Sequence, residues 1–395
     1  MQSVIFVILR RMRAPLTVLI CSYAISVLGL TLIPGIDDQG NPWHMDFFHA
    51  FYFVSFMGST IGFGEIPYPF TDAQRLWTLF TIYATVVVWL YAIGTTIALI
   101  QTPSFRAAVA HNLFTKRIRR LRETFYLICG YGDTGRMLVH ALVAQNQQVV
   151  VVDTDPARID ELELAGLPVD IPALCGDASD PSVLEAAGLK SDSCAGVIAL
   201  IRSDDINLKI AVAAKLLHPR VRVFCRSEHH DTAANMASFG TDHIINPYDT
   251  FADDFATALS SPSLYLLRQW LTSPASTPLT EPVFPPHGLW ILCGYGRFGK
   301  ALYDRLTNHG ERVQVVEAAP ELTRPPEGTI TGRGTEAETL EEANIENAVG
   351  IIAGTDNDVN NLSILMTAET LKPKIFTLAR QEFSADDEIF EAVDA

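Results

Sequence analysis

Ser59-Thr60-Ile61-Gly62-Phe63-Gly64-Glu65 lies between two long apolar segments of this 395-residue chain. Gly62 and Gly64 can adopt left-handed backbone angles that residues with a Cβ resist, so they can turn successive carbonyl groups towards one axis. Four copies of such a strand would supply the rings of carbonyl oxygens that replace the hydration shell of an ion. The hydroxyl of Thr60 can add a further oxygen at the inner mouth. The stretch therefore predicts an ion-selectivity filter.

The apolar segments on either side predict two membrane spans. Residues 14–33 and 76–100 contain no charged side chain, and each is long enough to cross a hydrocarbon layer of roughly 30 Å as a helix. Basic residues flank the outer ends of the pair, and the loop between the spans is acidic or neutral, so both termini are expected in the cytoplasm. The alternative for the first segment is a signal peptide, because Arg10, Arg11 and Arg13 precede it. No small-residue cleavage site follows it, and the second span needs a partner.

The loop between the spans is too apolar for a plain extracellular loop. Residues 46–57 (DFFHAFYFVSFM) form the pattern of a short amphipathic helix that carries many aromatic side chains. Irregular backbone at membrane depth is tolerated where it is buried in protein or lines a water-filled path. A re-entrant pore helix followed by the filter strand fits this rule, and its C-terminal dipole end would favour a cation. The alternative, an interfacial loop, leaves Gly62 and Gly64 unexplained.

The charge of the chain is distributed unevenly. The net charge is −16, and residues 1–122 carry ten lysines and arginines against five acids, which leaves −21 for residues 123–395. An acidic cytoplasmic part argues against nucleic acid as a partner, because phosphates need a basic face. Five of the six cysteines lie in this part without a paired metal-ligand spacing.

The cytoplasmic part contains an internal repeat. Residues 125–135 (FYLICGYGDTG) recur as residues 289–299 (LWILCGYGRFG), and an acid, Asp153 or Glu317, ends the next apolar strand of each copy. Strands alternate with helical patterns throughout, which predicts two α/β doubly wound Rossmann-like domains with parallel sheets.

Each copy has the order of a nucleotide-binding unit: strand, G-x-G-x-x-G, helix, strand and acid. The first glycine makes the tight turn, the second admits a phosphate, and the third lets the helix pack on the strand. The acid is placed to accept hydrogen bonds from a ribose diol. The candidate nucleotide-binding residues are Gly130, Gly132, Asp133, Thr134, Gly135, Arg136, Asp153 and Asp177 in the first copy, and Gly294, Gly296, Arg297, Gly299 and Glu317 in the second. The alternative is that one or both pockets keep the fold without a ligand.

The two copies differ where a phosphate would lie. Asp133 in the first glycine loop would repel a phosphate, although Arg136 on the first helical turn can offset that charge. Arg297 and Lys300 in the second copy favour phosphate. Arg333, however, stands where the first copy has Asp177.

The chain resembles prokaryotic two-span potassium channels that carry tandem RCK (regulator of potassium conductance, TrkA-N-like) domains. The resemblance rests on TIGFGE, on the repeat, and on residues 176–181 (GDASDP) and 240–248 (GTDHIINPY). It implies K⁺ as the permeant ion, bound at Thr60, Ile61, Gly62 and Phe63. It further implies a homotetramer with eight RCK domains in a gating ring, in the inner (plasma) membrane of a prokaryote. Phe63 and Glu65 depart from the commoner tyrosine and aspartate, so the hydrogen bonds behind the filter are expected to differ.

These observations give a set of expected domain boundaries: a pore domain at 1–102, a gating linker at 103–123, a first RCK domain at 124–272, a proline-rich linker at 273–287 and a truncated second RCK domain at 288–395. Within 249–272 we expect a helical pair broken at Ser261-Pro262-Ser263, which in RCK domains crosses to the neighbouring subunit. Gly94 in the second span is either a gate hinge or a packing notch.

Three classes of function remain to be weighed. A potassium channel would be gated by NAD, by an adenine nucleotide such as ADP or ATP, or by a divalent cation. A membrane-anchored NAD-linked oxidoreductase would need a substrate domain and a positioned acid or base, and neither is recognisable in the sequence. A non-selective cation channel, or a regulatory partner of a separate transporter, would not need the intact filter stretch. The sequence favours the channel.

Overall fold

The computed structural model describes residues 2–273, 282–382 and 387–392. These form two compact units, Met1–Leu113 and Phe114–Ala395. Residues 274–281, about half of the expected proline-rich linker at 273–287, lie outside the described part.

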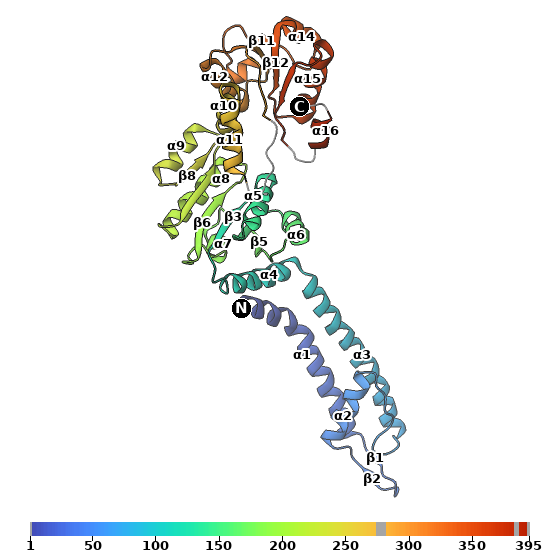
Figure 1. Cartoon of the computed structure of the whole chain (residues 1–395). Helices are drawn as coiled ribbons and strands as arrows, with labels where there is room; N and C mark the ends of the chain where they lie inside the picture. Colours follow the sequence, from blue (N-terminus) through green and yellow to red (C-terminus); the bar gives the residue numbers. More distant parts are fainter. Residues whose placement is uncertain (1, 274–281, 383–386, 393–395) are drawn as a thin grey trace. The chain divides into compact units, whose positions relative to one another are not determined.

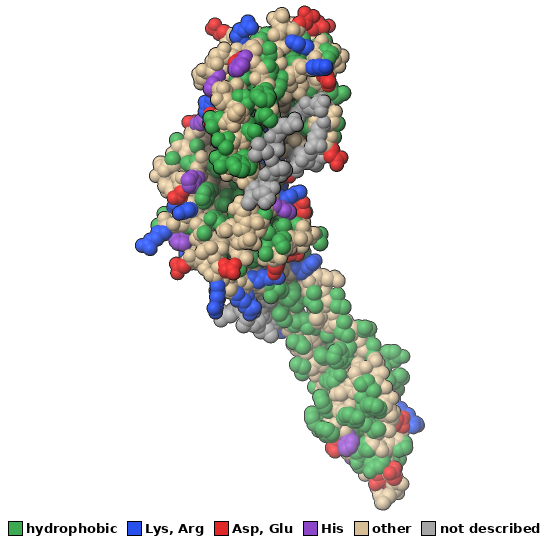
Figure 2. Space-filling model, in the orientation of Figure 1, with side chains coloured by type: hydrophobic (Ala, Val, Ile, Leu, Met, Phe, Trp, Pro, Cys, Tyr) green, Lys and Arg blue, Asp and Glu red, His purple; other side chains and the backbone are tan. Residues whose placement is uncertain are grey.

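The first unit consists of two long helices and a short one. α1 (Gln2–Leu32) packs along α3 (Asp72–Gln101), and α2 (Phe47–Gly58) contacts both (Figure 1). By length and composition, Arg10–Leu32 and Asp72–Gln101 could each cross a membrane. Figure 2 shows hydrophobic side chains over much of the surface of this unit, which is the distribution expected of lipid-facing or subunit-facing helices. A hairpin of two short antiparallel strands, β1 (Gly35–Ile36) and β2 (Pro42–Trp43), joins α1 to α2.

Local capping fixes where α2 and α3 begin. The carboxylate of Asp46 accepts a hydrogen bond from the His49 amide at the start of α2, and Thr71 forms a capping box with Gln74 at the start of α3. Such caps satisfy amides that have no partner within the helix. The short helix predicted from residues 46–57 is confirmed, and its buried side chains pack against Val27 and Leu30 of α1.

The second unit contains two parallel sheets. The first has the strand order β5-β4-β3-β6-β7-β8 and the second has the order β11-β10-β9-β12-β13. The strands of the first are β3 (Phe125–Cys129), β4 (Gln148–Asp153), β5 (Ala173–Cys175), β6 (Cys194–Ala199), β7 (Arg222–Arg226) and β8 (His243–Ile245). Those of the second are β9 (Leu289–Cys293), β10 (Arg312–Glu317), β11 (Ile330–Thr331), β12 (Ala348–Ala353) and β13 (Phe376–Ala379). Five strands share one order in both sheets, so the predicted doubly wound fold of each repeat is confirmed.

Helices connect the strands of both sheets. In the first α/β domain they are α5 (Asp133–Ala144), α6 (Pro156–Leu164), α7 (Pro181–Ala186), α8 (Asp204–Leu217) and α9 (His230–Ser238). In the second they are α12 (Arg297–Asn308), α13 (Pro320–Thr323), α14 (Ala337–Glu342), the 3-10 turn η1 (Ile345–Asn347), α15 (Asp358–Leu371) and the short α16 (Asp387–Glu391). α4 (Pro103–Ile118) precedes the first sheet, and its last turn enters the core there through Phe114 and Ile118.

The expected helical pair broken at Ser261-Pro262-Ser263 is present between the sheets, and its crossing to a neighbouring subunit stays a prediction. The buried face of α10 (Pro247–Ser260) completes the core of the second α/β domain in the same chain. Phe255 meets Trp290 edge to face, with ring centroids 5.5 Å apart. α10 packs there because one face of the second sheet is strongly apolar and is buried from solvent by this helix. Among its described residues, α11 (Pro262–Thr272) buries none and exposes an apolar row that includes Leu264, Leu267 and Trp270.

This packing predicts that Phe255→Ala destabilises the second α/β domain by about 3 kcal/mol, because it removes a buried ring and leaves a cavity against Trp290. Hydrogen exchange of the full-length protein should show faster exchange in β9 and β12. Leu264→Ala, on the exposed row of α11, is the control and should leave those strands unchanged. Equal exchange in the Phe255→Ala variant and the parent would contradict the assignment of α10 to this core.

Candidate filter and ligand pocket

The filter strand leaves the end of α2 with an alternating backbone. Thr60, Gly62 and Gly64 have positive φ angles of 66°, 65° and 100°, whereas Ile61 and Phe63 between them do not. Alternation between left- and right-handed angles turns successive carbonyl groups to one side of a strand, as a ring of carbonyl ligands requires. The glycines take these angles without cost, but Thr60 is β-branched and held there against its preference. The sequence indicated left-handed angles at the two glycines, and it indicated Thr60 as a filter residue but not its left-handed angle.

The two departures from the family pattern both make contacts behind the filter. The ring of Phe63 packs edge to face against Phe56 of α2, with centroids 5.4 Å apart. The carboxylate of Glu65 accepts hydrogen bonds from Nε and Nη2 of Arg75, at 2.8 and 3.1 Å, and from the Phe70 amide at 2.8 Å. The bond from Arg75, followed by that from Phe70, lowers the pKa of Glu65. Glu65 thus ties the end of the filter to the start of α3.

Gly94 lies within a continuous α3. A Cβ added at Gly94 would meet no atom within 4 Å, so packing within this chain does not require a glycine there. The packing-notch alternative finds no support inside one chain, and the gate hinge stays a prediction.

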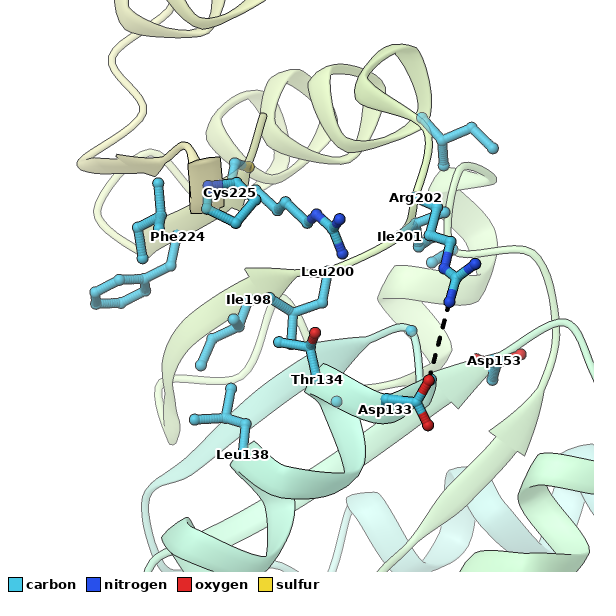
Figure 3. A pocket seen from close by; sticks show the side chains of 18 of the residues that line it. Asp133, Thr134, Leu138, Asp153, Ile198, Leu200, Ile201, Arg202, Phe224 and Cys225 are labelled. Carbon is cyan, nitrogen blue, oxygen red and sulfur yellow. Dashed lines mark ion pairs between the residues drawn. The ribbon is translucent and has the colours of Figure 1, made fainter. Parts of the chain in front are cut away.

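A pocket of about 1000 Å³ opens at the carboxyl edge of the first sheet. Its polar part is formed by the first glycine loop with Asp133 and Thr134, by Asp153 and by Asp177. Its apolar wall is the sheet face and α5, through Leu138, Ile198 and Phe224 among others (Figure 3). Arg380 and Glu382 of the second α/β domain complete the lining. The sequence-predicted residues of the first copy, except Arg136, thus meet in one pocket.

The glycines of the first loop have the steric roles that the motif predicts. Gly130 has a φ of 104°, and a Cβ at Gly135 would lie 2.1 Å from the carbonyl oxygen of Gly130. Any side chain at Gly135 would therefore push α5 away from β3. Gly294 and Gly299 repeat both features, with a φ of 98° and a distance of 2.0 Å.

The acid after the second strand holds the glycine loop in place. Oδ2 of the buried Asp153 accepts the Tyr131 amide at 2.6 Å, and Oδ1 accepts the Asp155 amide at 2.8 Å. Glu317 does the same for Tyr295 and Ala319, at 2.6 and 3.0 Å. A carboxylate oxygen can accept more than one hydrogen bond, so this structural role leaves Asp153 capacity for a ligand hydroxyl. The sequence did not indicate that the acid also braces the loop.

The cation facing Asp133 is not the predicted one. Arg136 forms a two-point ion pair with Glu161, at 2.9 and 3.0 Å, and it does not line the pocket. Its expected contribution to nucleotide binding is therefore corrected, because Glu161 of α6 holds the guanidinium of Arg136 outside the pocket lining. Arg202, which follows β6, points towards Asp133 instead, with Nη2 and Oδ2 3.9 Å apart (Figure 3).

The second glycine loop is engaged by the first domain. Arg297 pairs with the buried Glu228 at 2.7 Å, and its guanidinium lies 5.7 Å from the centre of the Tyr248 ring. Gly294, Gly296, Arg297 and Glu317 do not line the pocket described above. The structure thus separates the candidate residues into an open first site and a second loop whose cation is already paired.

Within the described part of the chain, no group of three or more His, Cys, Asp or Glu side chains could hold a metal ion.

The fold and these two sites define a class: a two-span ion-channel-type helical unit joined to tandem α/β Rossmann-like domains. The chain belongs to the TrkA-N domain family, whose sequence model matches residues 126–247 and 290–395, more than half of the chain. The family model described as "Ion channel" matches residues 15–102.

Curated relatives of the chain include named potassium channels. Over 221 residues the chain is 28% identical to "Potassium channel protein 1" of Methanocaldococcus jannaschii, a match that covers 55% of this chain and 64% of that protein. Over 208 residues it is 26% identical to "Voltage-gated potassium channel Kch" of Escherichia coli, covering 52% and 48% of the two chains. Each match spans less than two thirds of the relative's own length.

Solved structures of one channel share the fold. The GsuK channel bound to ADP superposes with a TM-score of 0.54 at 18% identity, covering 99% of this chain and 94% of the other. The GsuK channel bound to NAD gives 0.55 at 16% identity, covering 100% and 81%.

Proposed function

We propose that the chain is a potassium-selective channel whose opening is controlled by a nucleotide bound in the first α/β domain. The observation that carries the proposal is the alternating backbone at Thr60, Gly62 and Gly64. It follows α2 between two helices that are apolar and long enough to span a membrane, and the curated relatives are named potassium channels. The carbonyl groups of Thr60, Ile61, Gly62 and Phe63 would bind K⁺ in place of water.

A ring of carbonyl ligands needs several chains around one axis. We infer a homotetramer in the plasma membrane of a prokaryote, with both termini in the cytoplasm and eight α/β domains in a gating ring. The exposed apolar row of α11 supports a contact between subunits, because isolated apolar rows of this kind mark interaction surfaces.

The ligand is inferred to be NAD or an adenine nucleotide such as ADP or ATP. The pocket has the glycine turn, the buried acid and the helix N-terminus of a nucleotide site, and GsuK, which shares the fold, has been solved with ADP and with NAD. Two α/β domains without a substrate domain suit sensing better than dehydrogenase chemistry. A ligand opens or closes the pore only to the extent that it binds one state of the ring more tightly.

Ion flux tests the filter directly. Full-length protein in liposomes should pass K⁺ far better than Na⁺, and Gly62→Ala should abolish conduction, because alanine resists the left-handed angle at that position. Nucleotide binding should persist in the variant, which serves as the control for folding. Equal K⁺ and Na⁺ fluxes through the parent protein would rule out a selective channel.

The two acids give a matched test of the nucleotide site. Asp153→Asn keeps an oxygen for the Tyr131 amide but loses the charge that favours ribose hydroxyls, so the response of K⁺ flux to nucleotide should be lost or weakened by at least about tenfold. Glu317→Gln is the equivalent change in the second copy, and it should leave the response unchanged because Arg297 there is paired with Glu228. A response that survives Asp153→Asn and disappears in Glu317→Gln would move the site to the second copy.

Outer pH should act through Glu65, which lies outside both spans. Because Arg75 lowers the pKa of Glu65, the ion pair is intact at neutral pH and is lost as the outer pH falls through that lowered pKa. We expect inactivation to become faster on outer acidification, and Glu65→Gln to inactivate fast already at neutral pH. Currents in planar bilayers measure this. A Glu65→Gln channel with parental inactivation at neutral pH would show that the ion pair does not hold the filter.

A further inference from the structure

Glu382 joins two arginines that come from different domains. Its Oε1 lies 3.0 Å from Nη1 of Arg202, which follows β6 in the first α/β domain. Its Oε2 lies 2.6 Å from Nη2 of Arg380, which follows β13 in the second. One carboxylate thus occupies a site with two guanidinium groups around it, which is the donor set that binds phosphate and carboxylate most strongly.

The other repeat also has a glutamate between two arginines of different domains, but that glutamate is more deeply buried. Glu228 bridges Arg226 of its own strand end, at 2.5 Å, and Arg297 of the opposite domain, at 2.7 Å. The Glu228 side chain is 8% exposed, whereas that of Glu382 is 25% exposed. Glu382, Arg202 and Arg380 all line the pocket, and neither Glu228 nor Arg297 does. Arg226 of the Glu228 bridge also lines the pocket, but among the described residues only the Glu382 bridge has all three of its members in the lining.

A phosphate at the first glycine loop needs cations that offset the charge of Asp133. Asp133 places a carboxylate in the first turn of α5, where the motif usually receives a phosphate. Arg136 is held by Glu161 and Arg158 by Asp153. The other arginines of the lining are Arg226, which pairs with Glu228, Arg202, 3.9 Å from Asp133, and Arg380, which lies 5.3 Å from the centre of the Tyr248 ring.

We propose that Arg202 and Arg380 form the phosphate subsite of the pocket, and that Glu382 fills this subsite in the absence of ligand. The inference rests on the nucleotide site of the proposed function. A di- or triphosphate, or the pyrophosphate of a dinucleotide, displaces the Glu382 carboxylate from the two guanidinium groups. Because Arg202 and Glu382 belong to different domains, binding of phosphate exchanges an interdomain ion pair for contacts with the ligand.

Calorimetry of the full-length protein in detergent, with adenosine, AMP, ADP and NAD as probes, tests the subsite. Glu382→Gln removes the competing charge and should tighten ADP about fivefold to tenfold, with no change for adenosine, which has no phosphate. Arg202→Gln should weaken ADP by about tenfold and leave adenosine unchanged. Glu161→Gln breaks an arginine–carboxylate pair that does not line the pocket, and its affinities should match the parent's.

The outcomes separate this inference from the proposed function. ADP affinity that is unchanged in both Glu382→Gln and Arg202→Gln, with binding otherwise intact, overturns the subsite and leaves the nucleotide site standing. An equal gain for adenosine and ADP in Glu382→Gln also overturns it, because the effect would then not depend on phosphate. Failure of the parent protein to bind any of the four probes overturns both.

Discussion

The ligand pocket depends on one hydrogen bond, from the Tyr131 amide to the buried carboxylate of Asp153. The tight turn at Gly130 leaves that amide pointing away from the sheet, and a buried amide without an acceptor costs about 1–3 kcal/mol. The carboxylate satisfies it, and so fixes the loop, the start of α5 and the open edge of the sheet together. Glu317 makes the equivalent bond to Tyr295 in the second copy. A feature that suggests ribose recognition is thus in part a brace that both copies need in order to fold.

The two repeats differ in the charged side chains at the contact between their domains. Both domains end their fifth repeated strand with Arg-x-Glu, and both glutamates reach an arginine of the opposite domain. The glycine loops differ at two positions, and one of them changes a charge: the first loop has Asp133 where the second has Arg297. In the second loop Arg297 forms an ion pair with Glu228 of the first domain, so this loop takes part in the contact between the two domains. Asp133 in the first loop cannot form an ion pair with a glutamate. Arg202 lies instead between Asp133 and Glu382, beside the open pocket. The copy with Asp133 thus keeps an open pocket, whereas the arginine of the other copy takes part in the contact between the domains.

The sequence predicted what local chemistry determines. Glycine spacing, apolar strands and terminal acids give both sheets, the glycine loops and the filter, because backbone angles and strand ends are set within a few residues. Arg136 was expected to offset the charge of Asp133 but pairs with Glu161, because a long side chain pairs with partners that only the tertiary fold brings close. Arg202 and Glu382 lie 180 positions apart in sequence, and no periodicity links them. The left-handed Thr60 was also missed, because threonine does not favour that angle by itself and is held there by its neighbours.

α10 follows β8 of the first sheet directly in the chain, yet its Tyr248, Phe255 and Leu259 belong to the core of the second domain. The boundary between the two repeats in the sequence therefore differs from the boundary between the two hydrophobic cores. A cut in the chain after α11 would divide the covalent structure but leave α10 seated on Trp290 and Leu302, so the two fragments would stay associated without a peptide bond. Conversely, the second repeat expressed from β9 onward would lack one wall of its core. The two α/β domains repeat as separate units of sequence, but the core of the second is completed by a helix that precedes it in the chain.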